Sequence, residues 1–226
     1  MTGFSPADYA ALGFFIVAWA GYHLAIESST AGGRSLNRLM NAHRHLWMER
    51  MVVRENRVVD TTIMASLQNG TAFFASTSLF AIGGALTLFR SPDEVLTLFA
   101  ESPFGATTSR VAWEMKIVGL AVIFVYAFFK FAWSYRLFNY VAILIGSVPV
   151  RPEPDDPEAK TTALRAAAMH VVAGKHFNRG QRAFFFALAY LGWFIGPYAM
   201  IGATAAVLLV MWRRQFASDA IKALEG

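Results

Sequence analysis

Small and polar residues recur on one side of the longest uncharged stretch, residues 61–89. They are spaced mostly at seven-residue intervals: Thr62, Ser66, Asn69, Ser76 and Gly83. Positions seven apart lie within about 20° of one another on a helix. In a membrane, such a face indicates either close helix packing or a path for solutes. Both interpretations place it against protein or water, as does the adjacent amide of Gln68, which is costly against lipid.

Ionisable residues beside the apolar stretches form a second candidate set. We expect four of them near the cytoplasmic membrane boundary: Glu27, Asp60, Lys130 and Arg136. A charge inside a bilayer costs roughly 2.5–3.5 kcal/mol on insertion scales, so such groups pair or face water. The set is interpreted either as interfacial anchors or as an ion-pair cluster that gates or binds a ligand. In that cluster, Asp60 pairs with Lys130 or Arg136.

Basic residues follow the first apolar stretch at helical spacing. Arg50, Arg54 and Arg57 fall at i, i+4 and i+7, hence on one face of a continuous helix. Such a face can reach anionic lipid headgroups, or several copies of it can form an anion site. Arg179 and Arg182 precede the last apolar stretch and fit either a membrane anchor or the same kind of site. Nucleic-acid binding is not expected, because no soluble basic domain would present these residues.

Cofactor chemistry finds little support in the residue types. The chain has no cysteine, which excludes thiolate metal sites, iron–sulfur clusters and disulfides. The pair His43 and His45 is spaced poorly for chelation from one helix, and so is the pair His170 and His176. A bis-histidine haem would need His23 and a second histidine at the same membrane depth. We therefore predict no metal and no cofactor, and we favour a protein that is not an enzyme.

The elements that must position these residues follow from composition. Of the 226 residues, 56% are apolar and only 15% are charged, and the mean hydropathy is +0.42. Soluble domains average about 45–50% apolar and about 25% charged residues. The sequence thus predicts one transmembrane domain over 1–226, with spans at about 9–27, 61–89, 111–135 and 183–212. The first span is expected to be retained, because residues 1–8 lack the positive charge of a signal peptide.

The predicted fold class is all-α: a polytopic helical membrane protein with four transmembrane helices. The third helix is expected to be long, fading near Gly146 and Pro149, and a cytoplasmic amphipathic helix is expected after the first span, starting near Ser35. Gly196 and Pro197 interrupt the last apolar stretch, and proline removes a helical hydrogen bond. We expect a kinked fourth helix there, with a hairpin as the alternative.

Lysine and arginine counts predict the orientation. Residues 27–60 hold six of these residues and residues 130–182 hold eight, whereas residues 90–110 hold two. Because cytoplasmic loops are enriched in these residues, four spans place the N-terminus outside. Arg213, Arg214 and Lys222 fit poorly with four spans, but a hairpin would return them to the cytoplasm.

Several segments resemble one family. They are NAHRHLWMERMVVRENRVVD (41–60), QNGTAFFASTSLFAIGG (68–84), FKFAWSYRLFNY (129–140), HFNRGQRAFFFALAYLGWFIGP (176–197) and RRQFASDA (213–220). Together they resemble the integral membrane proteins grouped as domain of unknown function 599, over nearly the whole chain. The resemblance implies a multi-pass protein of the bacterial inner (cytoplasmic) membrane. It implies no reaction, ligand or catalytic residue.

Three functions remain open on this reading. The first is an oligomeric channel or small transporter for ions or small solutes, built around the small and polar face of 61–89. The second is a non-catalytic accessory or scaffold subunit that binds a partner membrane protein or anionic lipid. The third is a cofactor-binding membrane enzyme. Membrane lipids and further copies of the chain are the expected partners.

Overall fold

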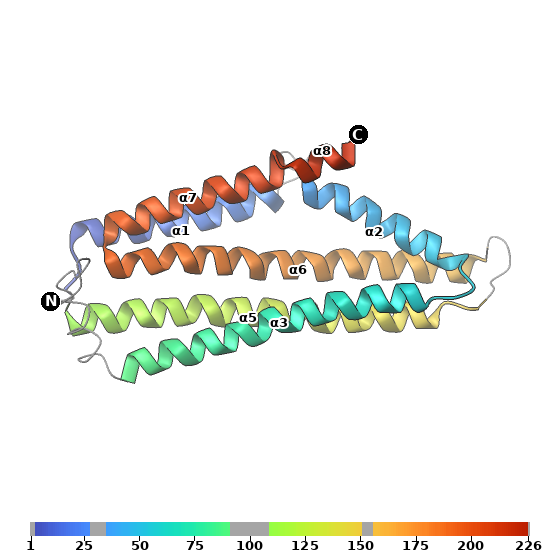
Figure 1. The fold of residues 1–226 in the computed structure, drawn as a ribbon, viewed down its shortest axis with the longest axis horizontal. Helices are drawn as coiled ribbons and strands as arrows, with labels where there is room; N and C mark the ends of the chain where they lie inside the picture. The colour runs from blue at the N-terminus through green and yellow to red at the C-terminus, as the bar shows by residue number, and fades with distance from the viewer. Residues whose placement is uncertain (1–2, 28–34, 91–108, 151–155, 226) are drawn as a thin grey trace. The chain divides into compact units, whose positions relative to one another are not determined.

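The computed structural model describes residues 3–27, 35–90, 109–150 and 156–225, and every regular element in these ranges is a helix (Figure 1). The predicted all-α class is confirmed for this part of the chain. The helices are α1 (Pro6–Glu27), α2 (Leu36–Val52), α3 (Val58–Arg90), α5 (Arg110–Ser147), α6 (Pro157–Ile195), α7 (Pro197–Phe216) and α8 (Asp219–Glu225). Most of the connection 90–110 lies outside the described residues.

Three of the described helices, α1, α3 and α5, are long and apolar enough to cross a membrane. They coincide with the predicted spans 9–27, 61–89 and 111–135, and α5 is the long third helix expected from the sequence. At about 1.5 Å per residue, the 33 residues of α3 and 38 of α5 exceed a hydrocarbon core of about 30 Å. Both α3 and α5 are therefore longer than a perpendicular crossing of the hydrocarbon core requires.

The predicted count of four spans is not confirmed, because the fourth apolar stretch, 183–212, is shared between α6 and α7. It forms a hairpin rather than one kinked helix (Figure 1). A Cβ atom on Gly192 would lie 3.0 Å from the backbone oxygen of Ala199. Seven residues of continuous helix would separate these positions by about 10 Å along the axis. The chain therefore reverses at Gly196, as the alternative interpretation proposed.

The helices begin where short polar side chains accept their first amide hydrogens. The Ser5 amide donates to Asp8 Oδ2 (2.9 Å) and the Asp8 amide to Ser5 Oγ (3.2 Å), a reciprocal cap around Pro6. The Glu158 amide donates to Asp156 Oδ1 (2.8 Å) in front of α6. Helix α2 begins at Leu36, directly after the start predicted near Ser35. These starts are local, so they can be read from the sequence.

The described chain divides into two compact units. The first comprises Met1–Ser35, Ser78–Tyr126 and Arg182–Gly226; the second comprises Leu36–Thr77 and Ala127–Gln181. Helices α3, α5 and α6 each contribute one part to both units. Each unit has its own packed interior.

In the first unit, α1 packs beside α7 and contacts the C-terminal part of α6 through aromatic rings. Phe15 meets Phe186 edge-on with ring centroids 5.6 Å apart, and Trp19 stacks on Phe186 at 5.3 Å. Edge-on and stacked pairs contribute about 0.5–1.5 kcal/mol beyond area burial. The Tyr22 hydroxyl donates to the Met211 carbonyl oxygen (3.1 Å), which fixes the register of α1 on α7.

In the second unit, α2 packs on α5 and α6 through a core of methionine, aliphatic and alanine side chains. Met48, Met51, Val141 and Ala166 are fully buried. Alanines along α6 keep its surface low, so neighbouring helices approach closely. The Ser134 hydroxyl donates to the Ala173 carbonyl oxygen across the α5–α6 contact (2.8 Å). The predicted amphipathic helix thus exists, and its C-terminal apolar side packs on protein.

The hairpin makes a prediction about Gly192. A valine there would push its side chain into the Ala199 backbone, so Gly192→Val should destabilise the protein by about 1–3 kcal/mol. In the matched control, Gly202→Val on α7, the added Cβ meets no atom within 4 Å. We expect a lower thermal unfolding midpoint in detergent for the first variant only. Equal midpoints for the two variants would contradict the hairpin.

Candidate functional site

A buried carboxylate joins the end of α2 to the start of α3. Asp60, in the first turn of α3, is fully buried. Its Oδ1 accepts hydrogen bonds from Trp47 Nε1 (2.6 Å) and Arg54 Nη1 (2.5 Å). The N-terminal end of a helix also favours a negative charge. Within the described residues Asp60 Oδ2 has no hydrogen-bond partner, so one acceptor oxygen of this carboxylate is available inside the fold.

Arg57 forms hydrogen bonds at the C-terminal end of α5. Its Nη1 donates to the Val148 carbonyl oxygen (2.5 Å) and its Nη2 to that of Pro149 (2.6 Å). The last carbonyl groups of a helix lack internal partners, and a cation near them is favoured by the helix dipole. The Arg57 guanidinium therefore joins the C-terminal end of α5 to the turn in front of α3.

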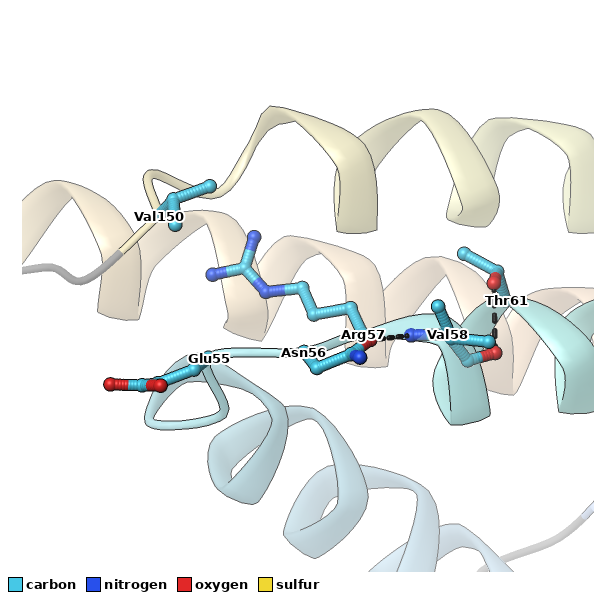
Figure 2. Close-up of a pocket in the computed structure, with 6 residues that line it drawn as sticks. All are labelled: Glu55, Asn56, Arg57, Val58, Thr61 and Val150. Carbon is cyan, nitrogen blue, oxygen red and sulfur yellow. Dashed lines mark hydrogen bonds between the residues drawn. The ribbon is translucent and has the colours of Figure 1, made fainter.

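An open pocket of about 630 Å³ lies at this turn, lined by Glu55, Asn56, Arg57, Val58, Thr61 and Val150 (Figure 2). Several of its polar groups are already engaged. Asn56 Oδ1 accepts the Val58 amide hydrogen (2.9 Å), and the Thr61 hydroxyl donates to the Val58 carbonyl oxygen (2.9 Å). Because the Arg57 Nη groups also bond backbone carbonyls, the polar atoms of this pocket mainly hold the turn together.

A buried histidine lies next to this network, in a part of α6 outside the three candidate spans. The His170 ring meets Trp47 edge-on at 5.3 Å and Phe138 at 5.5 Å. Burial, aided by the charge of Arg44, lowers the pKa of His170 from its usual 6.5 to about 3. His170 is therefore neutral at physiological pH, and its Nδ1 has no hydrogen-bond partner among the described residues.

The four predicted boundary charges are divided between the two units, and Asp60 has a different partner from the two expected. Glu27 lies 3.3 Å from Arg182 and 3.6 Å from His23 in the first unit. In the second unit, Asp60 pairs with Arg54 rather than with Arg136, whose Nε donates to the Tyr140 hydroxyl (2.6 Å). Lys130 lies partly buried on α5.

The predicted arginine face is wrong in its geometry. Helix α2 ends at Val52, so only Arg50 belongs to it, and Arg54 and Arg57 lie in the turn that follows. The Arg54 amide donates to the Met51 carbonyl oxygen (3.2 Å), which marks the end of the helix. Arg182, expected to bind lipid or an anion, is buried and paired with Glu27. Arg179 lies partly buried on α6.

The small and polar face of α3 lies on the surface of the chain. Thr62, Ser66, Asn69, Ser76 and Gly83 are all exposed. Gln68 points elsewhere, because its Nε2 donates to Asn139 Oδ1 (2.7 Å) inside the second unit. The structure thus separates the two adjacent amides, one inside the unit and one on the face.

Sequence reasoning missed the contact between Lys116 and Trp193 in the first unit. Lys116 is buried, and its Nζ donates to the Trp193 carbonyl oxygen (2.8 Å) at the end of α6. Trp193 Nε1 in turn donates to Asp8 Oδ1 (2.7 Å). A lysine inside an apolar stretch was the available signal, but its partner is 77 residues away. Among the described residues, no group of three or more histidine, aspartate and glutamate side chains could hold a metal ion.

The buried histidine predicts a pH dependence of stability. A folded pKa near 3 against 6.5 in the unfolded chain means that the unfolded state binds the proton between these values. The contribution of neutral His170 to the free energy of unfolding is therefore present above pH 6.5 and is lost as the pH falls. Between pH 7 and pH 5 the free energy of unfolding should decrease by roughly 2 kcal/mol through this group. Between pH 7 and pH 5, the thermal unfolding midpoint of the His170→Phe variant in detergent should therefore fall less than that of the original chain. A variant with the same pH profile as the original chain would contradict this assignment.

The comparisons with known proteins add a family but no activity. No curated protein and no solved structure matches the chain. The family described as "Protein of unknown function, DUF599" matches residues 10–220. The match covers the candidate spans, the α2–α3 turn and the hairpin, and on this extent the chain belongs to the DUF599 family.

Proposed function

We propose that this protein is a homo-oligomeric channel or small transporter of the bacterial inner membrane, whose subunits meet along α3. In the proposed assembly the small and polar face of α3 provides subunit contacts and gives ions or small solutes a polar surface through the bilayer. The observation that carries the proposal is the exposure of this face on an apolar candidate span.

The position of Ser76 supports a role inside the bilayer. Residues 61–89 form 29 uncharged positions, and a span needs about 20. Any such run drawn from this stretch contains Phe73, Ser76 and Phe80. Phe73 and Phe80 are 65% and 80% exposed and lie on the same side as Ser76, three and four residues away. An exposed hydroxyl between two exposed rings is suited to contact with another helix or with water.

The spacing along α3 supports pairing between copies. With the two phenylalanines included, the exposed positions alternate at intervals of four and three residues: Thr62, Ser66, Asn69, Phe73, Ser76, Phe80, Gly83 and Thr87. That alternation is the seam of left-handed helix packing. Small residues on such a seam let backbones approach, and an amide or hydroxyl on it can hydrogen-bond across the contact.

A non-catalytic scaffold that binds anionic lipid or a partner is the second candidate. It is favoured by Arg50, which is exposed on α2, together with exposed apolar side chains of Leu46 and Val53. It is weakened by Arg54 and Arg57, which bond Asp60 and the end of α5. Only part of the basic surface expected for headgroups is therefore available.

The hairpin supports an orientation with the N-terminus outside and the C-terminus in the cytoplasm. Three spans, α1, α3 and α5, place residues 27–60 and 130–182 on one side. Because α7 returns beside α6, Arg213, Arg214 and Lys222 come back to that same side. The proposed arrangement agrees with the enrichment of lysine and arginine in cytoplasmic segments.

The transport proposal predicts a loss of flux from changes on the α3 face. Ser76→Leu and Asn69→Leu should each reduce ion or small-solute flux into proteoliposomes at least tenfold, because leucine removes the polar group and narrows the seam. Leu86→Ala, which changes an exposed residue on another side of α3, should leave flux near the original level. Normal flux in both leucine variants would overturn this placement of the path.

The proposed orientation can be tested with single cysteines, because the natural chain has none. Glu158→Cys and Lys222→Cys should both be protected from a membrane-impermeant maleimide in intact cells, and both should react after lysis. Arg110→Cys, at the start of α5, should react in intact cells. Labelling of Lys222→Cys from outside, with Glu158→Cys protected, would contradict the return of the chain at Gly196.

A further inference from the structure

An apolar groove of about 560 Å³ runs between α1 and α7 in the first unit. Its floor is formed by the buried side chains of Ala18 and Tyr22. Its walls are far more exposed: Val17 is 70% exposed and Leu209 71%. The remaining lining comes from Phe14, Gly21, Ala25, Ala205, Leu208 and Trp212. The groove is thus a lengthwise depression in an apolar surface.

Small residues create the depression. Ala18, Gly21 and Ala25 follow one another at intervals of three and four, so they share one side of α1. A Cβ atom on Gly21 would meet no atom within 4 Å, so the space above it is open. Ala205 keeps the facing part of α7 equally low.

The length of the groove matches one leaflet of a bilayer. From Phe14 to Ala25 the helix rises by about 16 Å, roughly half of a hydrocarbon core of about 30 Å. Helix α1 is itself apolar enough to span a membrane. The hydrogen bond from Tyr22 to the Met211 carbonyl oxygen sets the C-terminal ends of α1 and α7 at the same end of the groove.

The chemistry changes at that end. Trp212 closes the groove and is 49% exposed, and Arg213 follows it with an exposed side chain. Tryptophan is enriched where hydrocarbon meets headgroups, and arginine binds phosphate through its fork of donors. The nearest acid of α1, Glu27, is paired with Arg182, so its charge is compensated. Arg214 lies over the Phe185 ring at 5.2 Å.

We infer that this groove binds one anionic phospholipid, with an acyl chain along α1 and α7 and the headgroup at Trp212 and Arg213. The asymmetry of the groove favours this occupant: it is apolar along its length and cationic at one end, as a phospholipid is apolar with an anionic head. A transmembrane helix from another copy would have no reason to require the cation. The inference does not depend on the proposed transport function.

The experiment is native mass spectrometry of the delipidated full-length protein, mixed with phosphatidylglycerol or phosphatidylcholine of the same acyl chains. We expect one phosphatidylglycerol to be retained at least fivefold more than phosphatidylcholine. Gly21→Phe, which fills the groove, should reduce binding of phosphatidylglycerol at least tenfold. Gly13→Phe is the matched control, because Gly13 is an exposed residue of α1 outside the lining and its added Cβ also meets no atom within 4 Å.

Arg213→Gln tests the headgroup contact separately, because it removes the charge and leaves the groove open. In this variant the ratio of retained phosphatidylglycerol to retained phosphatidylcholine should be close to one. Equal retention of both lipids by the original chain would overturn the inference, as would equal effects of Gly21→Phe and Gly13→Phe. Loss of an oligomer in Gly21→Phe with unchanged lipid binding would assign the groove to a contact between copies instead. Flux measured on the same variants reports on the transport proposal independently.

Discussion

Asp60 sets the constraint on which the second unit depends. A carboxylate without solvent contact must be paired inside the fold, because an unpaired buried charge is strongly destabilising. Its two donors come from α2 and from the turn after it, Trp47 and Arg54, so one side chain fixes where α2 stops and α3 starts. The same indole packs against His170, and the carboxylate is thereby coupled to the α6 side of the unit.

The ends of the long helices obey the same rule. Removing the backbone carbonyls of a helix end from water costs free energy unless a donor replaces the lost hydrogen bonds. Arg57 supplies donors to the end of α5, Lys116 to the end of α6, and Tyr22 to a carbonyl near the end of α7. Lys116 and Tyr22 donate from another helix, and Arg57 donates from the turn in front of α3. The hydrogen bonds that satisfy the end of a helix therefore also attach that helix to a neighbouring segment.

This non-local pairing explains which features could be predicted from the sequence. Uncharged runs and polar caps such as Ser5 act over a few residues, so the positions of α1, α3 and α5 could be predicted. The predicted common face of Arg50, Arg54 and Arg57 does not form, because Arg54 lies in the turn after α2 and bonds Asp60. At Gly196 the local signal marked an interruption, but reversal depends on the contact of α7 with α1, which no local pattern contains.

The distribution of satisfied and exposed polar groups also locates where function is to be sought. Inside the units, Gln68 is paired with Asn139, Ser134 with a carbonyl of α6, and Arg182 with Glu27. These contacts specify packing and leave those side chains committed to it. On α3, by contrast, Ser76 is exposed on a helix that is long and apolar enough to cross a membrane. The described part of the chain leaves that face exposed, and the proposed assembly assigns its polarity to a partner: another copy, or the water of a shared path.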